Sequence, residues 1–205
     1  HLRRRQLEEG RADPQAEREL ARLESLDYRV KAGGGRQGPE LEAFWERWRE
    51  QYGESGLVNA RGDRLIAELA CRAMKELKPI LMMVNFNDCD YVHWGIPEHY
   101  TRGIAVMDES LRRLTEAVEN DPEYRGNTVL VVAPDCGRDD NRFKAIPFQH
   151  HFGDRSAHEV FALFLGPGIP AGKVLDARTE QVDVAPTVAG LMGFSMPHAE
   201  GRALL

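Results

Sequence analysis

The sequence predicts an α/β fold in which a mostly parallel sheet is flanked by helices. Three short apolar runs, at residues 79–86, 128–133 and 160–165, have the length and composition of buried strands. Amphipathic helical stripes precede the first run, separate it from the second and follow the third. Strands and helices in such alternation form βαβ units, whose helices cover a parallel sheet. The 205 residues, 42% of them hydrophobic, suffice for one such domain or for a large part of a bigger one.

Residues 1–56 are predicted to form a helical segment separate from this sheet. The stretch 1–30 is rich in Arg, Glu, Leu and Ala, and the glycine-rich run near 31–39 is typical of a flexible linker. Aromatic and leucine side chains in 40–52 recur at the helical period, so we expect a helix that packs against a core. The chain therefore divides into residues 1–56 and a larger α/β part, residues 57–205.

The larger part begins with a predicted helix and a predicted strand. Apolar residues from Leu65 to Leu77 lie on one helical face, and the pattern ends before Pro79. The run PILMMVNF at 79–86 follows, and its apolar character predicts a strand that is buried on both faces. A long helix comes next, because apolar residues three and four apart continue from Tyr100 to Val118.

Two further strands and a last helix complete the predicted order. TVLVVA at 128–133 is β-branched and apolar, and VFALFL at 160–165 is closed by a Gly-Pro-Gly turn. We predict a helix over 184–192, with Asp183 as its N-cap and Gly193 as the residue that stops it.

Composition excludes several classes of function. A net charge of −6 gives no broad cationic surface, so neither nucleic acid nor an anionic membrane is expected as the main partner. No apolar stretch approaches the roughly 20 residues that span a bilayer. Three cysteines, Cys71, Cys89 and Cys136, are too few for a disulfide framework, and the cellular compartment stays undetermined. Because the chain starts at His1 without a signal peptide, we expect the natural protein to begin further upstream.

Two polar clusters directly follow predicted strands, at the carboxyl ends where a parallel sheet gathers its ligands, and a third lies in the loop before the last predicted strand. They lie at residues 87–93, 135–138 and 149–154. Carboxylate oxygen and imidazole nitrogen are ligands for zinc, manganese and similar divalent ions, and two such ions can promote hydrolysis of a phosphate or sulfate ester. The candidate ligands are Asp88, Asp90, His93, Asp135, His150 and His151.

Each of these side chains also has a purely structural interpretation. Asp88 and Asp90 could cap the turn after a strand, and His93 could be a packed histidine that bonds the backbone. Asp135 could be an ordinary turn residue, and the adjacent histidines could lie in a solvated loop. Their joint occurrence at strand ends favours the metal site over these separate explanations.

Five motifs in this order resemble the second half of the alkaline-phosphatase superfamily, which includes phosphatases, phosphodiesterases, sulfatases and phosphoglycerate mutases. The resemblance covers about residues 57–205, and a terminal EGRALL fits the same pattern. It implies an alkaline-phosphatase-like α/β fold of which the N-terminal part is incomplete. The motifs are NFNDCDYVHWG (85–95), NTVLVVAPDCGRDDN (127–141), FQHHFGD (148–154), EVFALFLGPGI (159–169) and VDVAPTVAGLMG (182–193).

The resemblance implies a ligand set for a first metal. Asp90 or Asp88, together with His93, would bind it, and His150 or His151 would supply the third protein ligand. Family members usually place the Asp and the His four residues apart. Here the separation is three from Asp90 and five from Asp88, so the choice between them stays open.

The implied second metal site departs from the family. Asp135 would bind this metal, but Cys136 stands where the family has the His of an Asp-His-Gly motif. Thiolate binds zinc well, which makes zinc the expected metal, with calcium or manganese as alternatives. The cysteine could instead mark a decayed site. A third alternative is that Cys89 and Cys136 pair with each other or share a metal.

Another departure concerns the nucleophile. In this family a Ser, Thr or formylglycine nucleophile follows an opening strand, and no such strand precedes residue 79 in this chain. The resemblance thus implies the C-terminal portion of a metal-dependent phosphate- or sulfate-ester hydrolase that acts on small molecules and is inactive as an isolated chain. The alternative is a pseudoenzyme that keeps the fold as a binding or structural module.

Arg138 and the edge of the predicted sheet are further candidates for binding. Arg138 could bind the anionic group of a substrate, because guanidinium matches the oxygens of phosphate or sulfate, or it could be a surface residue of a charged loop. An incomplete sheet leaves an unpaired strand edge, so homo-oligomers are also expected.

Overall fold

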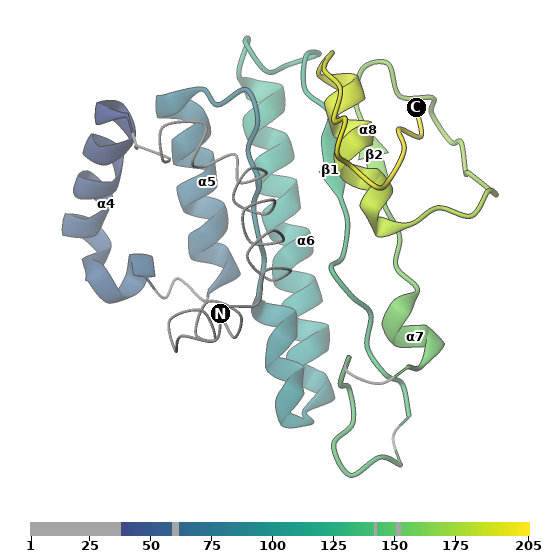
Figure 1. Cartoon of the computed structure of the whole chain (residues 1–205). Coiled ribbons are helices and arrows are strands. Elements are labelled where there is room, and N and C mark those ends of the chain that lie inside the picture. Colours follow the sequence, from purple (N-terminus) through teal and green to yellow (C-terminus); the bar gives the residue numbers. More distant parts are fainter. Residues whose placement is uncertain (1–37, 59–61, 142, 151–152) are drawn as a thin grey trace, which may run out of the picture. The chain divides into compact units, whose positions relative to one another are not determined.

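The computed structural model describes residues 38–58, 62–141, 143–150 and 153–205 (Figure 1). The chain divides into two compact units, His1–Gln51 and Tyr52–Leu205. The predicted helix in residues 1–30 and most of the predicted linker lie outside the described residues.

Helix α4 (Pro39–Val58) begins in the first unit and ends past its boundary at Gln51, and it confirms the helix predicted over 40–52. Phe44 and Trp48 are buried. Their rings meet edge to face with centroids 6.1 Å apart, an arrangement that suits the quadrupoles of aromatic rings. The aromatic spacing therefore has the structural role expected of it.

Two helices form the scaffold of the second unit and confirm both predicted stripes. These are α5 (Asp63–Leu77) and α6 (Pro97–Asn120), which pack side by side (Figure 1). Pro97 occupies the first turn of α6, where a missing N–H costs no hydrogen bond. Buried Ala70, Met74 and Leu114 form the core cluster between the helices.

The prediction of a buried strand at 79–86 is wrong. The segment is extended, but it pairs with no other strand among the described residues. Its side chains alternate as in a strand, so that Met82, Val84 and Phe86 pack against the core cluster. Ile80 and Met83 point away and are 93% and 92% exposed. The helices cover one face only, which is why burial on both faces does not occur in the described part of the chain.

The described sheet consists of β1 (Leu130–Val132) and β2 (Leu163–Leu165). The strands are antiparallel, with Leu130 opposite Leu165. Both lie within predicted strands, but a mostly parallel sheet is not confirmed. A parallel pair needs a crossover, usually a long helix, whereas the described helix between these strands is the short α7 (Arg155–His158).

The C-terminal region contains η2 (Gln181–Asp183) and α8 (Val184–Leu191), and α8 confirms the last predicted helix. Asp183 stands at the predicted N-cap position, but its carboxylate does not cap α8. It accepts the backbone N–H groups of Glu180 and Arg202 instead, each at 2.9 Å. These two hydrogen bonds, the Arg202 one first, hold the pKa of Asp183 below its ordinary value. The carboxylate thus fastens the C-terminal segment to η2.

None of the helices in the described ranges has the length and apolar character that a membrane crossing requires.

Candidate metal centre

A short 3-10 helix places two candidate ligands on one face. In η1 (Asp88–Trp94), Asp90 and His93 are three residues apart, which is one turn of such a helix. Asp90 Oδ1 lies 2.9 Å from His93 Nε2. Helix α6 supports this turn closely because Gly103 has no side chain: a Cβ there would lie 2.9 Å from the carbonyl carbon of Asp88.

His150 joins this pair from a loop distant in sequence. Its Nε2 lies 3.1 Å from Nε2 of His93, and the two rings meet edge to face at 4.8 Å. One ligand atom from each of Asp90, His93 and His150 lies within 4.8 Å of the other two. One carboxylate and two imidazoles form a donor set that fits a divalent transition metal, zinc in particular.

Gln149 orients the imidazole of His93. The Gln149 side-chain amide nitrogen donates to the carbonyl oxygens of His93 and Pro147, both at 3.3 Å. Its amide oxygen therefore faces Nδ1 of His93 at 2.8 Å, and Nδ1 must carry the proton of that hydrogen bond. In the tautomer with the proton on Nδ1, the Nε2 lone pair of His93 is directed toward Asp90 and His150. A metal-binding histidine needs this tautomer.

Arg138 lies against the same atoms. Its guanidinium is 2.8 Å from His93 Nε2 and donates to Asp90 Oδ1 at 2.6 Å. Partial burial opposes ionisation of Asp90. The Arg138 hydrogen bond, the Arg138 charge and the charges that His93 and His150 carry when protonated outweigh this burial, and the pKa of Asp90 falls below its ordinary value. The carboxylate is therefore ionised at neutral pH.

Glycine also positions the Arg138 loop. Gly137 donates its N–H to the carbonyl of Ala157 in α7 at 2.8 Å. A Cβ at Gly137 would lie 2.0 Å from the carbonyl oxygen of Ser156, so no other residue permits this approach. The loop is held against α7 with Arg138 turned toward η1.

An ion network holds the loop that carries His150. Asp139 is fully buried and pairs with Lys144, which also pairs with Asp154. The Lys144 hydrogen bond is the main reason that the pKa of Asp139 is lowered. Because the Asp139 N–H donates to the Gln149 carbonyl at 2.8 Å, the network fastens the residue next to His150.

Asp88 lies elsewhere and has a structural partner. Asp63, at the start of α5, accepts the backbone N–H groups of Asn87 and Asp88 at 2.7 and 3.0 Å. Asp88 in turn accepts the N–H of Asp63 at 3.2 Å. These reciprocal bonds join α5 to η1, and the structure places Asp90 rather than Asp88 beside the histidines.

The candidates for a second metal site are not part of this cluster. Asp135 is exposed and accepts the N–H of Cys136 through its carboxylate at 2.9 Å. Burial, and then the charge of Asp135, raise the pKa of the Cys136 thiol. Cys89 and Cys136 are both free, so the disulfide alternative is wrong, while a shared metal stays untested. His151 lies outside the described residues.

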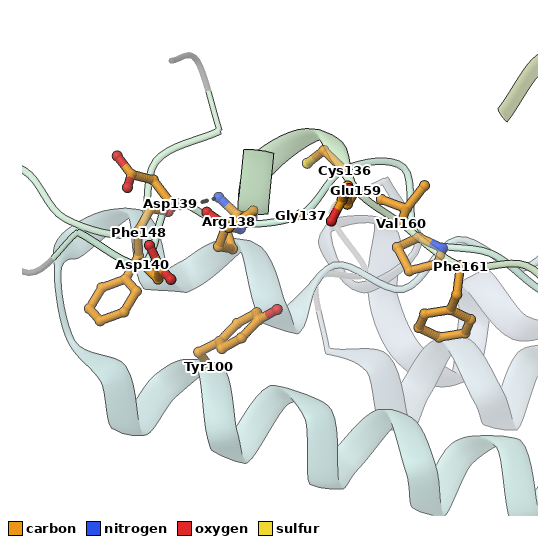
Figure 2. A pocket seen from close by; sticks show the side chains of 12 residues that line it. Tyr100, Cys136, Gly137, Arg138, Asp139, Asp140, Phe148, Glu159, Val160 and Phe161 are labelled. Carbon is orange, nitrogen blue, oxygen red and sulfur yellow. Dashed lines mark hydrogen bonds between the residues drawn. The ribbon is translucent and has the colours of Figure 1, made fainter. Parts of the chain in front are cut away.

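A cavity of about 370 Å³ adjoins the cluster through Arg138. Tyr100 stands on α6 and faces the loop that carries Arg138 and Cys136 (Figure 2). Burial is the main cause that raises the pKa of Tyr100, so its hydroxyl stays protonated and can donate a hydrogen bond. The remaining lining residues are Pro134, Gly137, Asp139, Asp140, Phe148, Ser156, Glu159, Val160 and Phe161.

The roles of Gln149, Asp63 and Lys144 were not among the predictions. Gln149 is adjacent to His150, which is the one sequence signal that pointed toward it. Asp63 and Lys144 act on residues that are distant along the chain or across a loop, and no local pattern marks them.

Comparisons with known proteins place the chain in a family of metalloenzymes. A family model described as the metalloenzyme superfamily matches residues 48–196. A sulfatase from Formosa agariphila is 32% identical over 99 residues, which make up 48% of this chain and 19% of that protein. The match thus spans about a fifth of the sulfatase's length. No solved structure matches the chain.

Proposed function

The chain belongs to the metalloenzyme superfamily of alkaline phosphatases and sulfatases, and we propose that it contributes the metal-binding part of a sulfate- or phosphate-ester hydrolase. The similarity to a sulfatase favours the sulfate ester. Membership of the superfamily implies a metal cofactor, for which Asp90, His93 and His150 form a candidate site.

The convergence of these three side chains is the observation that carries the proposal. Asp90 would hold the metal through a carboxylate oxygen, and His93 and His150 through Nε2. The imidazole-rich set favours zinc over calcium. Three protein ligands leave a coordination position open, and a metal bound there would polarise an ester oxygen and offset its developing charge.

The chain's own residues would supply orientation and anion binding around this centre. Gln149 keeps the proton of His93 on Nδ1, which leaves Nε2 available. Arg138 lines the cavity and would bind the anionic group of the ester. Phe148 and Phe161 offer apolar surface for the alcohol portion. We also propose Asp135 and Cys136 as ligands of a second metal, with the thiol losing its proton on binding.

Zinc binding to the purified 205-residue chain tests the proposal. After dialysis we expect about one tightly bound zinc per chain by elemental analysis, and loss of that zinc in His93→Ala and His150→Ala. An ion held by Asp135 and Cys136 has two protein ligands and should be removed by the dialysis. His198→Ala, which changes an exposed histidine outside the cluster, is the control and should keep the metal. A chain that takes up no zinc, or variants that retain it, would show that the cluster is not a metal site.

The competing proposal is a pseudoenzyme, and one observation favours it. Cys136 stands where the resemblance leads us to expect a histidine, and its pKa is raised. A metal-free chain that still folds cooperatively would support this alternative.

A further inference from the structure

The ligand atoms of the candidate metal centre already contact a cation from the chain itself. Asp90 Oδ1 and, with the His93 proton on Nδ1, His93 Nε2 present lone pairs to each other at 2.9 Å, and His150 Nε2 lies 3.1 Å from His93 Nε2. Such atoms repel one another unless a positive group lies among them. The guanidinium of Arg138 contacts two of them, Asp90 Oδ1 at 2.6 Å and His93 Nε2 at 2.8 Å.

Arg138 also belongs to the neighbouring cavity. Among the described residues that line the cavity, it is the one cation. The acidic side chains there are partly neutralised, since Glu159 pairs with Arg155 at 2.5 Å and Asp139 pairs with Lys144. An anionic ligand in the cavity would therefore depend on the Arg138 guanidinium, which is engaged with Asp90.

We propose that Arg138 holds the place of the metal in the metal-free chain, and that metal binding releases its guanidinium to bind an oxyanion in the adjoining cavity. His93 Nε2 has a single lone pair, so it cannot bind a divalent ion and accept a hydrogen bond from the guanidinium at the same time. A divalent ion bound to His93 and Asp90 would also repel the positive guanidinium at this distance. The guanidinium that leaves them is next to a cavity of about 370 Å³ in which it meets no second cation.

This arrangement couples the two binding events. Without metal, Asp90 withholds Arg138 from anions. With metal, the guanidinium is available, and the hydroxyl of Tyr100 can donate a further hydrogen bond on the opposite side of the cavity. Coupling is reciprocal, so an oxyanion should tighten metal binding by the same factor by which the metal tightens anion binding. This inference rests on the proposed metal site and adds the order of binding: the metal displaces Arg138, and Arg138 then binds the oxyanion.

Zinc titration of wild type and Arg138→Gln measures the competition. Removing the competing cation should tighten zinc binding roughly threefold to tenfold, since a partly exposed ion pair of this kind must be broken in the wild type. Arg138→Lys, which keeps the charge but not the planar fork, should fall between them. Arg112→Gln is the matched control, because Arg112 is 60% exposed and pairs within α6 with Glu116. It should leave the zinc affinity unchanged.

Sulfate titration of the same proteins tests whether zinc releases the Arg138 guanidinium. Without zinc, wild type and Arg138→Gln should bind sulfate equally weakly. With zinc, the wild type should bind sulfate roughly tenfold more tightly than Arg138→Gln. The zinc-loaded variant measures how strongly zinc alone attracts sulfate, so the difference between the two proteins is the contribution of Arg138. In the NMR spectrum of ¹⁵N-arginine-labelled chain, one Nε–H resonance should shift on zinc addition and should be missing from Arg138→Gln.

The outcomes separate this inference from the proposed function. Equal or weaker zinc binding by Arg138→Gln would overturn the competition while the metal site stands. Equal sulfate binding by the two zinc-loaded proteins would overturn the release. If none of the proteins binds zinc, the proposed metal site fails and this inference fails with it.

Discussion

His93 can ligate a metal only through a nitrogen that carries no proton, and Gln149 determines which nitrogen that is. The Gln149 amide donates to two carbonyls and so presents its oxygen to Nδ1 at 2.8 Å. Gln149 is buried, so water replaces this acceptor poorly. A single amide therefore sets both the tautomer and the ring orientation of a candidate ligand.

Gln149→Leu should weaken zinc binding by roughly tenfold to a hundredfold, because the His93 ring loses the acceptor that orients it. Gln149→Glu keeps an oxygen within reach of Nδ1 and should stay close to wild type. Isothermal titration of zinc into the three proteins measures the difference. Wild-type affinity in Gln149→Leu would mean that the ring is oriented by something else.

The candidate ligands were predictable from the sequence as residue types, but the choice among them was not. Spacing left Asp88 and Asp90 equally open, because the choice depends on a 3-10 turn. It also depends on Asp63, which engages the Asp88 backbone from 25 positions away. The contact of Arg138 with Asp90 joins residues 48 positions apart, and no local pattern encodes it.

Among the elements, the hydrogen-bonded contact between α5 and η1 sets the position of the metal cluster. Asp63 is fully buried and accepts two backbone N–H groups from the start of η1, while its own N–H donates to Asp88. Helix α5 thereby fixes one end of the turn that carries Asp90 and His93, and α6 supports the turn at Gly103.

Asp63→Ala should destabilise the chain by about 2 kcal/mol, because two backbone donors lose a charged acceptor. Asp63→Asn keeps one acceptor oxygen and should cost about half as much. Urea unfolding gives the free energies, and hydrogen exchange of the Asn87 and Asp88 amides should accelerate in both variants. Asp108→Ala, at an exposed position of α6, is the control. An unchanged unfolding midpoint in Asp63→Ala would mean that the contact between α5 and η1 adds no stability.

Helices were predicted well and the sheet was not, for a physical reason. The apolar stripes of α5 and α6 determine their packing face locally, because each helix forms its own backbone hydrogen bonds. A strand forms its backbone hydrogen bonds with another segment, and its own sequence does not show which segment that is. The run at 79–86 therefore predicted an apolar extended segment correctly, but not that Ile80 and Met83 would lie exposed. Self-association through an unpaired strand edge stays a prediction.

At the scale of the molecule, the described residues bring together side chains that would bind a metal and an oxyanion. They leave the group that attacks the ester unassigned. Asp90, His93 and His150 would hold a metal, and Arg138 would hold an oxyanion beside it. The resemblance implies a strand followed by a Ser, Thr or formylglycine nucleophile, and the absence of such a strand before residue 79 stays a prediction from the sequence. Binding without an attacking group lowers no barrier for a two-step transfer.

The zinc-loaded 205-residue chain should therefore hydrolyse 4-nitrophenyl sulfate and 4-nitrophenyl phosphate no faster than about tenfold over zinc in buffer. Release of nitrophenolate measures the rate, and His93→Ala provides the comparison, because any residual rate that comes from free zinc should survive that substitution. Sulfate binding should be lost in His93→Ala all the same, since Arg138 then has no metal to release it from Asp90. Rapid turnover that disappears in His93→Ala would show instead that a nucleophile is present within these 205 residues. The groups to substitute next would be the hydroxyl of Tyr100 and the thiol of Cys136, which both line the cavity beside Arg138.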